Sequence, residues 1–212
     1  MCSGQAIDPL SELKKFLAPY QPVEIPDLPR FFGGAVGYLG YDMVRHVEAL
    51  PEDNPAEIGT WDSYFQITET LLIFDNMRQK IKVVSNVHLS ESEDPTIAYD
   101  RAVQAIDALV GQLRAPLPGR PKFPLPAESS ELTSNFSRSD FEAAVLRCKD
   151  YVRAGDVIQV VLSQRFAGDL DVDPFDIYRA LRTINPSPYM YYLQHDGTRV
   201  IGASPEVLVR KE

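Results

Sequence analysis

Hydrophobic and polar positions along the chain follow helical spacing in some segments and strand spacing in others. Between residues 96 and 114 the apolar positions recur every three or four residues, which predicts an amphipathic helix. Those positions are Ala98, Ala102, Ile106, Leu109 and Leu113. Residues 11–17 predict a shorter helix. The segment SYFQITETLLIFDNMRQKIKVVSNVHL is rich in β-branched and aromatic residues and predicts a β-hairpin with a turn at Asp75 and Asn76.

In the second half of the chain, the same pattern predicts the order helix, strand, helix, strand, strand. Either Ser137 or Ser139 can cap the first helix, and Ser139 with Glu142 fits a capping box. Its apolar face carries Phe141, Val145, Cys148 and Val152, and it should stop at Gly155. The segment DVIQVVLSQRF, residues 156–166, predicts a strand. Asp173 followed by Pro174 opens another helix up to Ile184, and HDGT marks the turn of a closing hairpin.

A proline-rich stretch divides the chain. Five prolines lie between Pro116 and Pro126, and such a stretch holds neither a helix nor a central strand. The predicted organisation is therefore an N-terminal subdomain over residues 1–115, a linker over 116–130 and a second domain that begins at 131 and runs to 212.

Composition narrows the possible partners. The chain has 212 residues, 44% of them hydrophobic and 24% charged, which is typical of a globular protein with a sizeable core. A net charge of -9 argues against nucleic acid or an anionic membrane as partner. No apolar run approaches the roughly 18 residues that span a bilayer, and the first residues do not form a secretory signal. A cytoplasmic location is expected. The two cysteines have neither metal-binding nor disulfide spacing.

Most polar or glycine-rich motifs have a structural interpretation. Gly33, Gly34, Gly37 and Gly40 lack the G-x-G-x-x-G pattern, so close backbone packing of a strand is favoured over nucleotide binding. In residues 156–166, alternating polar side chains favour a half-solvated strand over a reactive site. These side chains are Asp156, Gln159, Ser163, Gln164 and Arg165. The histidines, His46, His88 and His195, are scattered, and each is expected at the surface.

The segment INPSPYMYYL is more specific. Pro186 and Pro188 fix φ and remove two backbone donors, so Ser187 must lie in a rigid, extended turn that directs the next strand. Rigid presentation of this kind suits a ligand contact. A loop that only leads into a core strand fits the same residues.

Four motifs together resemble a known family. GGAVGYLGYDMVRHVEALP, AGDVIQVVLSQRF, NPSPYMYYL and GASPEVLVR occur in the same order as in the large subunit of anthranilate synthase, over residues 8 to 210. The resemblance implies an α+β fold with antiparallel β-sheets packed face to face and flanking helices, here incomplete. Residues 1–115 would be part of its regulatory-type subdomain, and residues 131–212 the first part of its chorismate-binding domain.

The resemblance also implies an activity for the whole enzyme. Chorismate would bind with Mg²⁺, ammonia from a glutamine amidotransferase subunit would attack the ring, and loss of pyruvate would give anthranilate for tryptophan biosynthesis. Family members are more than twice as long as this chain. The catalytic residues and metal ligands are expected beyond Glu212, so no catalytic or metal-binding residue is assigned here and the chain alone is expected to be inactive.

The resemblance carries one site over to this chain. The residues that contact the feedback inhibitor L-tryptophan map to Pro188, Tyr189 and Met190, with Asn185 and Pro186 shaping the turn. A serine that completes the pocket in the family precedes residue 1, so tryptophan should bind weakly or not at all.

Two alternatives stay open. The large subunit of aminodeoxychorismate synthase shares the fold but typically lacks Pro-Ser-Pro-Tyr-Met here. A non-catalytic amino-acid-binding module is opposed by the uncovered strand edge it would leave.

Overall fold

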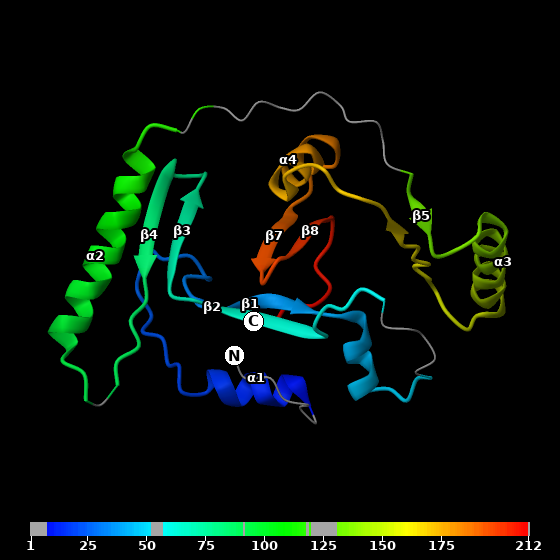
Figure 1. Cartoon of the computed structure of the whole chain (residues 1–212). Coiled ribbons are helices and arrows are strands. Elements are labelled where there is room, and N and C mark those ends of the chain that lie inside the picture. Colours follow the sequence, from blue (N-terminus) through cyan, green and yellow to red (C-terminus); the bar gives the residue numbers. More distant parts are fainter. Residues whose placement is uncertain (1–7, 52–56, 91, 118, 120–130, 212) are drawn as a thin grey trace. The chain divides into compact units, whose positions relative to one another are not determined.

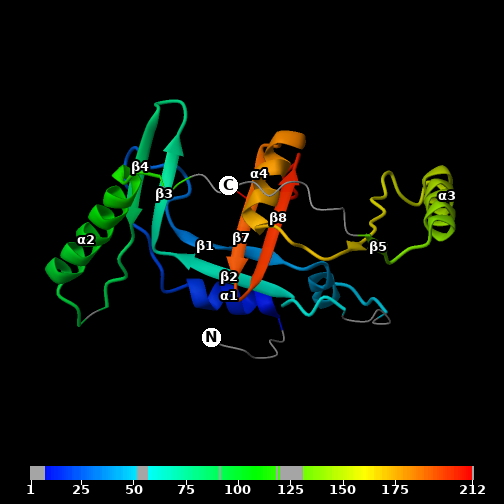
Figure 2. The same ribbon diagram turned by 45° about the horizontal axis from the view of Figure 1, so that its top comes forward.

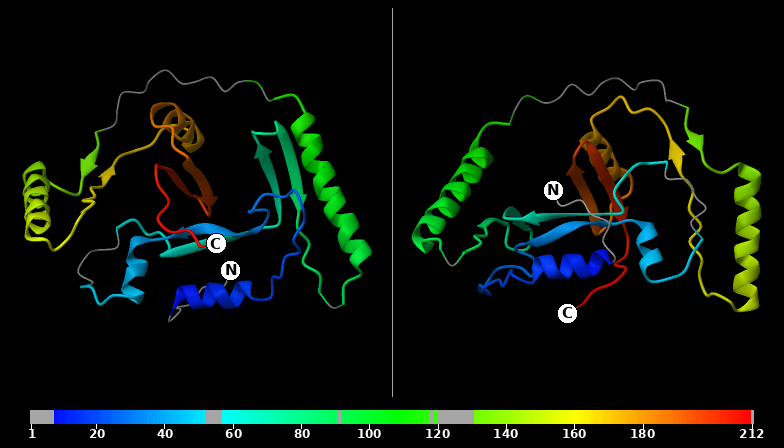
Figure 3. Two further views of the ribbon diagram at one scale, coloured as in Figure 1. Left: turned by 180° about the vertical axis from the view of Figure 1, so that it is seen from behind. Right: turned by 60° about the horizontal axis from the view of Figure 1, so that its bottom comes forward.

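The structure, a computed structural model, describes residues 8–51, 57–90, 92–117, 119 and 131–211. The chain forms two compact units, Met1–Gly119 and Arg120–Glu212. Figures 1, 2 and 3 show the elements of each unit from four sides. Helices and strands are mixed, and the strand pairs in the described residues are antiparallel, so the predicted α+β class with antiparallel sheets and flanking helices is confirmed. Each sheet has two strands among the described residues.

An Asp-Pro pair begins both α-helices of the first unit. These are α1 (Pro9–Leu17) and α2 (Pro95–Arg114), which confirm the two predicted helices. The caps Asp8 and Asp94 accept hydrogen bonds from the backbone amides two residues later, at 3.1 and 2.8 Å. Proline suits the first helical position because it needs no backbone donor there. Along the chain, a 3₁₀-helix, η1 (Tyr41–His46), lies between the first two strands of this unit.

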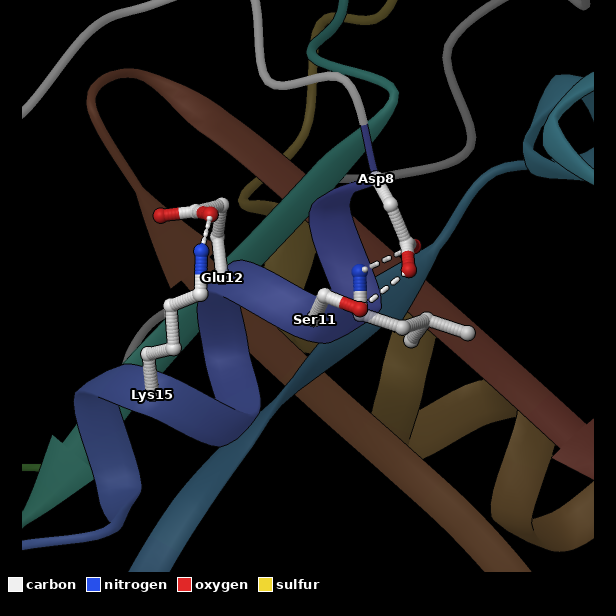
Figure 4. Close-up of polar contacts among 5 residues, drawn as sticks. Asp8, Ser11, Glu12 and Lys15 are labelled. Atoms are coloured by element: carbon white, nitrogen blue, oxygen red, sulfur yellow. Dashed lines mark hydrogen bonds and ion pairs between the residues drawn. The ribbon is translucent and has the colours of Figure 1, made fainter.

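Polar contacts also fix the start of α1 (Figure 4). The Ser11 hydroxyl donates to the Asp8 carboxylate, and this hydrogen bond lowers the pKa of Asp8. Lys15 pairs with Glu12 one turn earlier, with 2.6 Å between Nζ and Oε1. The hydrogen bond and the charge of Glu12 raise the pKa of Lys15. Both pairs are exposed, so they define local geometry rather than add much stability.

Two strand pairs complete the first unit. The predicted hairpin is confirmed as β3 (Thr70–Asp75) and β4 (Lys80–Ser85), and α2 packs along β4. The prediction of a single hairpin is wrong for the residues before β3. There, β2 (Ser63–Thr68) pairs with β1 (Gly34–Leu39). In β1, a Cβ on Gly37 would lie 1.8 Å from the carbonyl oxygen of Tyr64. The predicted close backbone packing is therefore confirmed at Gly37.

Little of the described chain is fully buried. The buried hydrophobic residues are Met43, Ala98 and Ala102, of which the two alanines belong to the predicted apolar face of α2. Tyr38 in β1 is half-buried, and burial raises the pKa of its hydroxyl, with further contributions from Asp62 and Tyr64.

The second unit begins with β5 (Thr133–Ser134) and α3 (Arg138–Ala154). Ser137 caps α3 by accepting from the amide of Asp140 at 3.1 Å, so the predicted capping box of Ser139 and Glu142 is wrong. Glu142 instead pairs with Arg138 at 2.8 Å. The helix ends at Gly155 as predicted, because φ is 84° there and glycine adopts this conformation without strain.

The strand predicted over residues 156–166 is wrong for most of its length. Only Phe166 belongs to a strand, β6 (Phe166–Ala167), which pairs with β5. Residues 157–164 join no strand among the described residues, and Ile158 and Val161 are 98% and 82% exposed. A strand needs a neighbour for its backbone groups, and apolar composition alone does not supply one.

The surface positions predicted for the histidines are confirmed for His46 and His88 but wrong for His195. His195 is only 5% exposed, at the last position of β7, where it pairs with Thr198.

Candidate functional site

The candidate site is the turn between helix α4 (Pro174–Ile184) and strand β7 (Tyr189–His195). As predicted, Asp173 caps α4, and its carboxylate accepts from the amide of Phe175 at 2.8 Å. The helix ends where the amide of Asn185 donates to the carbonyl of Leu181 at 2.8 Å. Asn185 itself leaves the helical region, with φ of -137° and ψ of 68°, as the following proline requires.

Residues 186–188 connect α4 to the sheet, and the side chain of Ser187 attaches them to it. The Ser187 hydroxyl donates to the carbonyl oxygen of Ser204 and accepts from the amide of Tyr189 at 3.3 Å. Pro186 and Pro188 supply no backbone donor. The turn is therefore attached to the sheet through a side chain at its centre.

The sheet beneath the turn is the predicted closing hairpin, which is confirmed. Strand β7 pairs with β8 (Thr198–Ser204) from Tyr189 opposite Ser204 to His195 opposite Thr198. Asp196 and Gly197 form the connection with φ of 37° and 82°. Positive φ at both positions matches the twist of the adjoining strands.

Helix α4 packs against this hairpin (Figure 3), and aromatic side chains from both elements contact one another. The ring of Tyr192 lies edge-on to Phe175 and Tyr178, with centroid distances of 5.3 and 6.0 Å. Such pairs contribute about 0.5–1.5 kcal/mol beyond the area they bury. Both ends of the turn thus belong to elements that contact each other.

The strand alternation separates two of the predicted ligand residues. Successive side chains of a strand point to opposite faces, so Tyr189 lies on one face and Met190 on the other. Tyr189 is 46% exposed and shares its face with Tyr191, whose ring lies over Gly202. Met190 is half-buried and shares its face with Tyr192. A ligand bound at this turn therefore contacts the side chain of only one of these two residues.

The predicted residues Asn185, Pro186 and Pro188 lie in the connection between α4 and β7, and Tyr189 and Met190 are the first two residues of β7. Their role in tryptophan binding stays a prediction. The sequence reasoning did not identify the contact of Ser187 with Ser204. A hydroxyl between two prolines was the available signal, because the proline on each side of it carries no backbone donor.

The remaining candidate chemistry has structural roles. The Gln164 side chain donates to Ser134 Oγ at 2.7 Å, and the amide of Arg165 donates to Asn135 Oδ1 at 2.8 Å, so both residues hold the β5–β6 pair together. Within the described ranges, no three His, Cys, Asp or Glu side chains come together as metal ligands. The described residues therefore include no cluster of side chains that fits a Mg²⁺ ion. No helix in the described part of the chain is long and apolar enough to cross a membrane.

Comparison with known proteins identifies the class. The profile of the chorismate binding enzyme family matches residues 3–212, and the chain belongs to this family. Its relatives include anthranilate synthase component 1 of Acetivibrio thermocellus, 42% identical over 97% of the chain, and that of Pseudomonas aeruginosa, 41% identical over 97%. The crystal structure of anthranilate synthase component I from Streptococcus pneumoniae matches 94% of the chain with a TM-score of 0.74 and 33% identity.

These matches confirm the resemblance to the anthranilate synthase large subunit. The chain spans 42% of the length of both relatives and 44% of the Streptococcus pneumoniae chain.

Proposed function

We propose that the chain is part of the large subunit of an anthranilate synthase and carries the part of it that senses L-tryptophan. The observation that carries this proposal is the anchored turn of Pro186 to Met190, within a chain 42% identical to anthranilate synthase component 1. The Pro-Ser-Pro-Tyr-Met sequence favours this reading over the folate-pathway relative.

The complete enzyme converts chorismate and ammonia to anthranilate and pyruvate, with ammonia from a glutamine amidotransferase subunit. Mg²⁺ serves this reaction as a Lewis acid when bound. Its ligands are expected outside the described residues, among which no three His, Cys, Asp or Glu side chains come together.

Tryptophan lies against the turn with its indole ring on the Met190 side chain. Met190 is apolar and half-buried, and its thioether favours contact with aromatic rings. Tyr189 lies on the opposite face and contacts the ligand through its backbone. The two prolines lower the cost of binding, because a turn that is already rigid loses less entropy.

A chimera tests this proposal. Residues 8–211 replace the aligned segment of the Acetivibrio thermocellus protein, and anthranilate fluorescence is recorded with chorismate, Mg²⁺ and ammonium. The chimera should form anthranilate and be inhibited by L-tryptophan. A chimera that folds but forms no anthranilate would contradict the assignment to this enzyme.

Substitution of one methionine tests the ligand contact. Met190→Ala should raise the inhibition constant for tryptophan about tenfold to a hundredfold, because burial of a methionine side chain contributes about 1.5–3 kcal/mol. Met77→Ala is the matched control, since Met77 is 95% exposed between β3 and β4. Equal inhibition of both variants by tryptophan would contradict the proposed contact of Met190.

A further inference from the structure

We propose that Ser187 is a positioning residue for tryptophan feedback, and that its hydroxyl sets the affinity of the turn without itself contacting the ligand. The inference rests on the proposed function and adds a residue to it. Its basis is the pair of hydrogen bonds through which Ser187 bridges the backbones of Tyr189 and Ser204.

The hydrogen bonds of Ser187 lie where the turn joins the sheet. Tyr189 and Ser204 face each other at the first position of the β7–β8 pairing. The hydroxyl of Ser187 therefore joins the turn to the end of the sheet, immediately before the residues that contact the ligand. Ser187 is half-buried, whereas Pro188 and Tyr189 are exposed.

Before the strand pairing begins at Tyr189, the turn has few backbone hydrogen-bond donors. Pro186 and Pro188 have no amide hydrogen, and at its helix end the turn is attached by the bond from the Asn185 amide to Leu181. Two prolines restrict φ within the turn but do not determine where the turn lies over the sheet. Without the hydroxyl, the turn keeps its internal shape and the strand pairing that begins at Tyr189, but loses the side-chain bond to the carbonyl of Ser204. Ligand affinity should fall because binding must then restore that position.

The test compares three substitutions in the chimera described above, which contains residues 8–211. Ser187→Ala removes the bridge, Ser187→Thr keeps a hydroxyl, and Ser204→Ala is the matched control. Ser204→Ala removes the Ser204 hydroxyl, which donates to the carbonyl of Glu206 at 2.9 Å, but leaves the carbonyl that Ser187 uses. The inhibition constant for tryptophan and the KM for chorismate are measured for each.

Ser187→Ala should raise the inhibition constant about tenfold, the effect of losing roughly one to two net hydrogen bonds. The KM for chorismate should stay unchanged, which a general loss of structure would not allow. Ser187→Thr should restore inhibition to within about threefold of the parent. Ser204→Ala should leave inhibition unchanged.

Hydrogen exchange supplies an independent measurement. A peptide covering residues 186–190 reports on the amides of Ser187, Tyr189 and Met190 alone, because the two prolines carry no exchangeable amide. Exchange in this peptide should become about tenfold faster in Ser187→Ala without ligand. Unchanged exchange would overturn the attachment that we infer.

The outcomes separate the two proposals. If tryptophan inhibits the parent chimera and Ser187→Ala equally, the positioning role of Ser187 is overturned while the tryptophan contact stands. If the parent forms anthranilate and tryptophan does not inhibit it, the proposed contact fails and the role of Ser187 in feedback fails with it.

Discussion

A methyl group at Gly37 should separate strands β1 and β2. In the substitution Gly37→Ala, the new Cβ would lie 1.8 Å from the carbonyl oxygen of Tyr64 and 2.8 Å from Cα of Phe65. Ordinary contact begins near 3.4 Å, so the strands must move apart by about 3.4 − 1.8 = 1.6 Å. The obstacle is backbone, which cannot rotate away as a side chain can.

The penalty follows from the hydrogen bonds between the strands. A bond of about 2.9 Å that lengthens by this amount exceeds the range of a hydrogen bond. Losing two such bonds costs about 1–3 kcal/mol, which agrees with the usual penalty of about 1–3 kcal/mol for overpacking. Among the described strands, β1 and β2 pair only with each other. An isolated two-stranded pair is marginally stable, so this penalty should abolish it.

Hydrogen exchange with mass spectrometry at low micromolar concentration measures the effect. Peptides covering residues 34–39 and 63–68 should lose their protection in Gly37→Ala. Gly111→Ala is the control, because Gly111 lies inside α2 with no atom within 4 Å of the added Cβ. It should stabilise α2 by about 0.5–1 kcal/mol. Wild-type protection of both strands in Gly37→Ala would refute the close approach.

Three further predictions concern stability at high pH, association and activity. Because burial raises the pKa of Tyr38 above 10.0, its contribution to stability is complete below about pH 10 and lost at higher pH. Tyr38→Phe should therefore lose less thermal stability than wild type between about pH 9 and pH 11, and equal losses by circular dichroism would contradict this. The isolated chain should bind a hydrophobic dye and associate, since Ile158 and Leu208 are each 98% exposed. It should also form no anthranilate. A cooperative, monomeric unfolding transition in urea would contradict the expected association, and product above a no-protein control would contradict the expected inactivity.

Local signals predicted the helices well. The spacing of Ala98 and Ala102 predicted the buried face of α2, and Asp173 with Pro174 predicted the start of α4. Each of these signals acts within a few residues, through a cap or a repeated apolar position, so no distant partner is needed.

Pairing between strands was harder to predict. The sequence indicated strand-like character in residues 63–68, but not that their partner is β1 rather than β3. It predicted a strand over residues 156–166, where most of the segment has no strand neighbour within the described residues. Apolar alternation is local, whereas a strand is completed by hydrogen bonds to another part of the chain.

For the candidate site, the sequence alone determined that the turn is rigid, because two prolines restrict φ wherever they occur. It also determined the family resemblance, since the four motifs are read directly from the residues. Only the tertiary structure decided that Ser187 binds Ser204, seventeen residues away. Such a contact depends on how β7 returns as β8, and the pairing of the two strands establishes it.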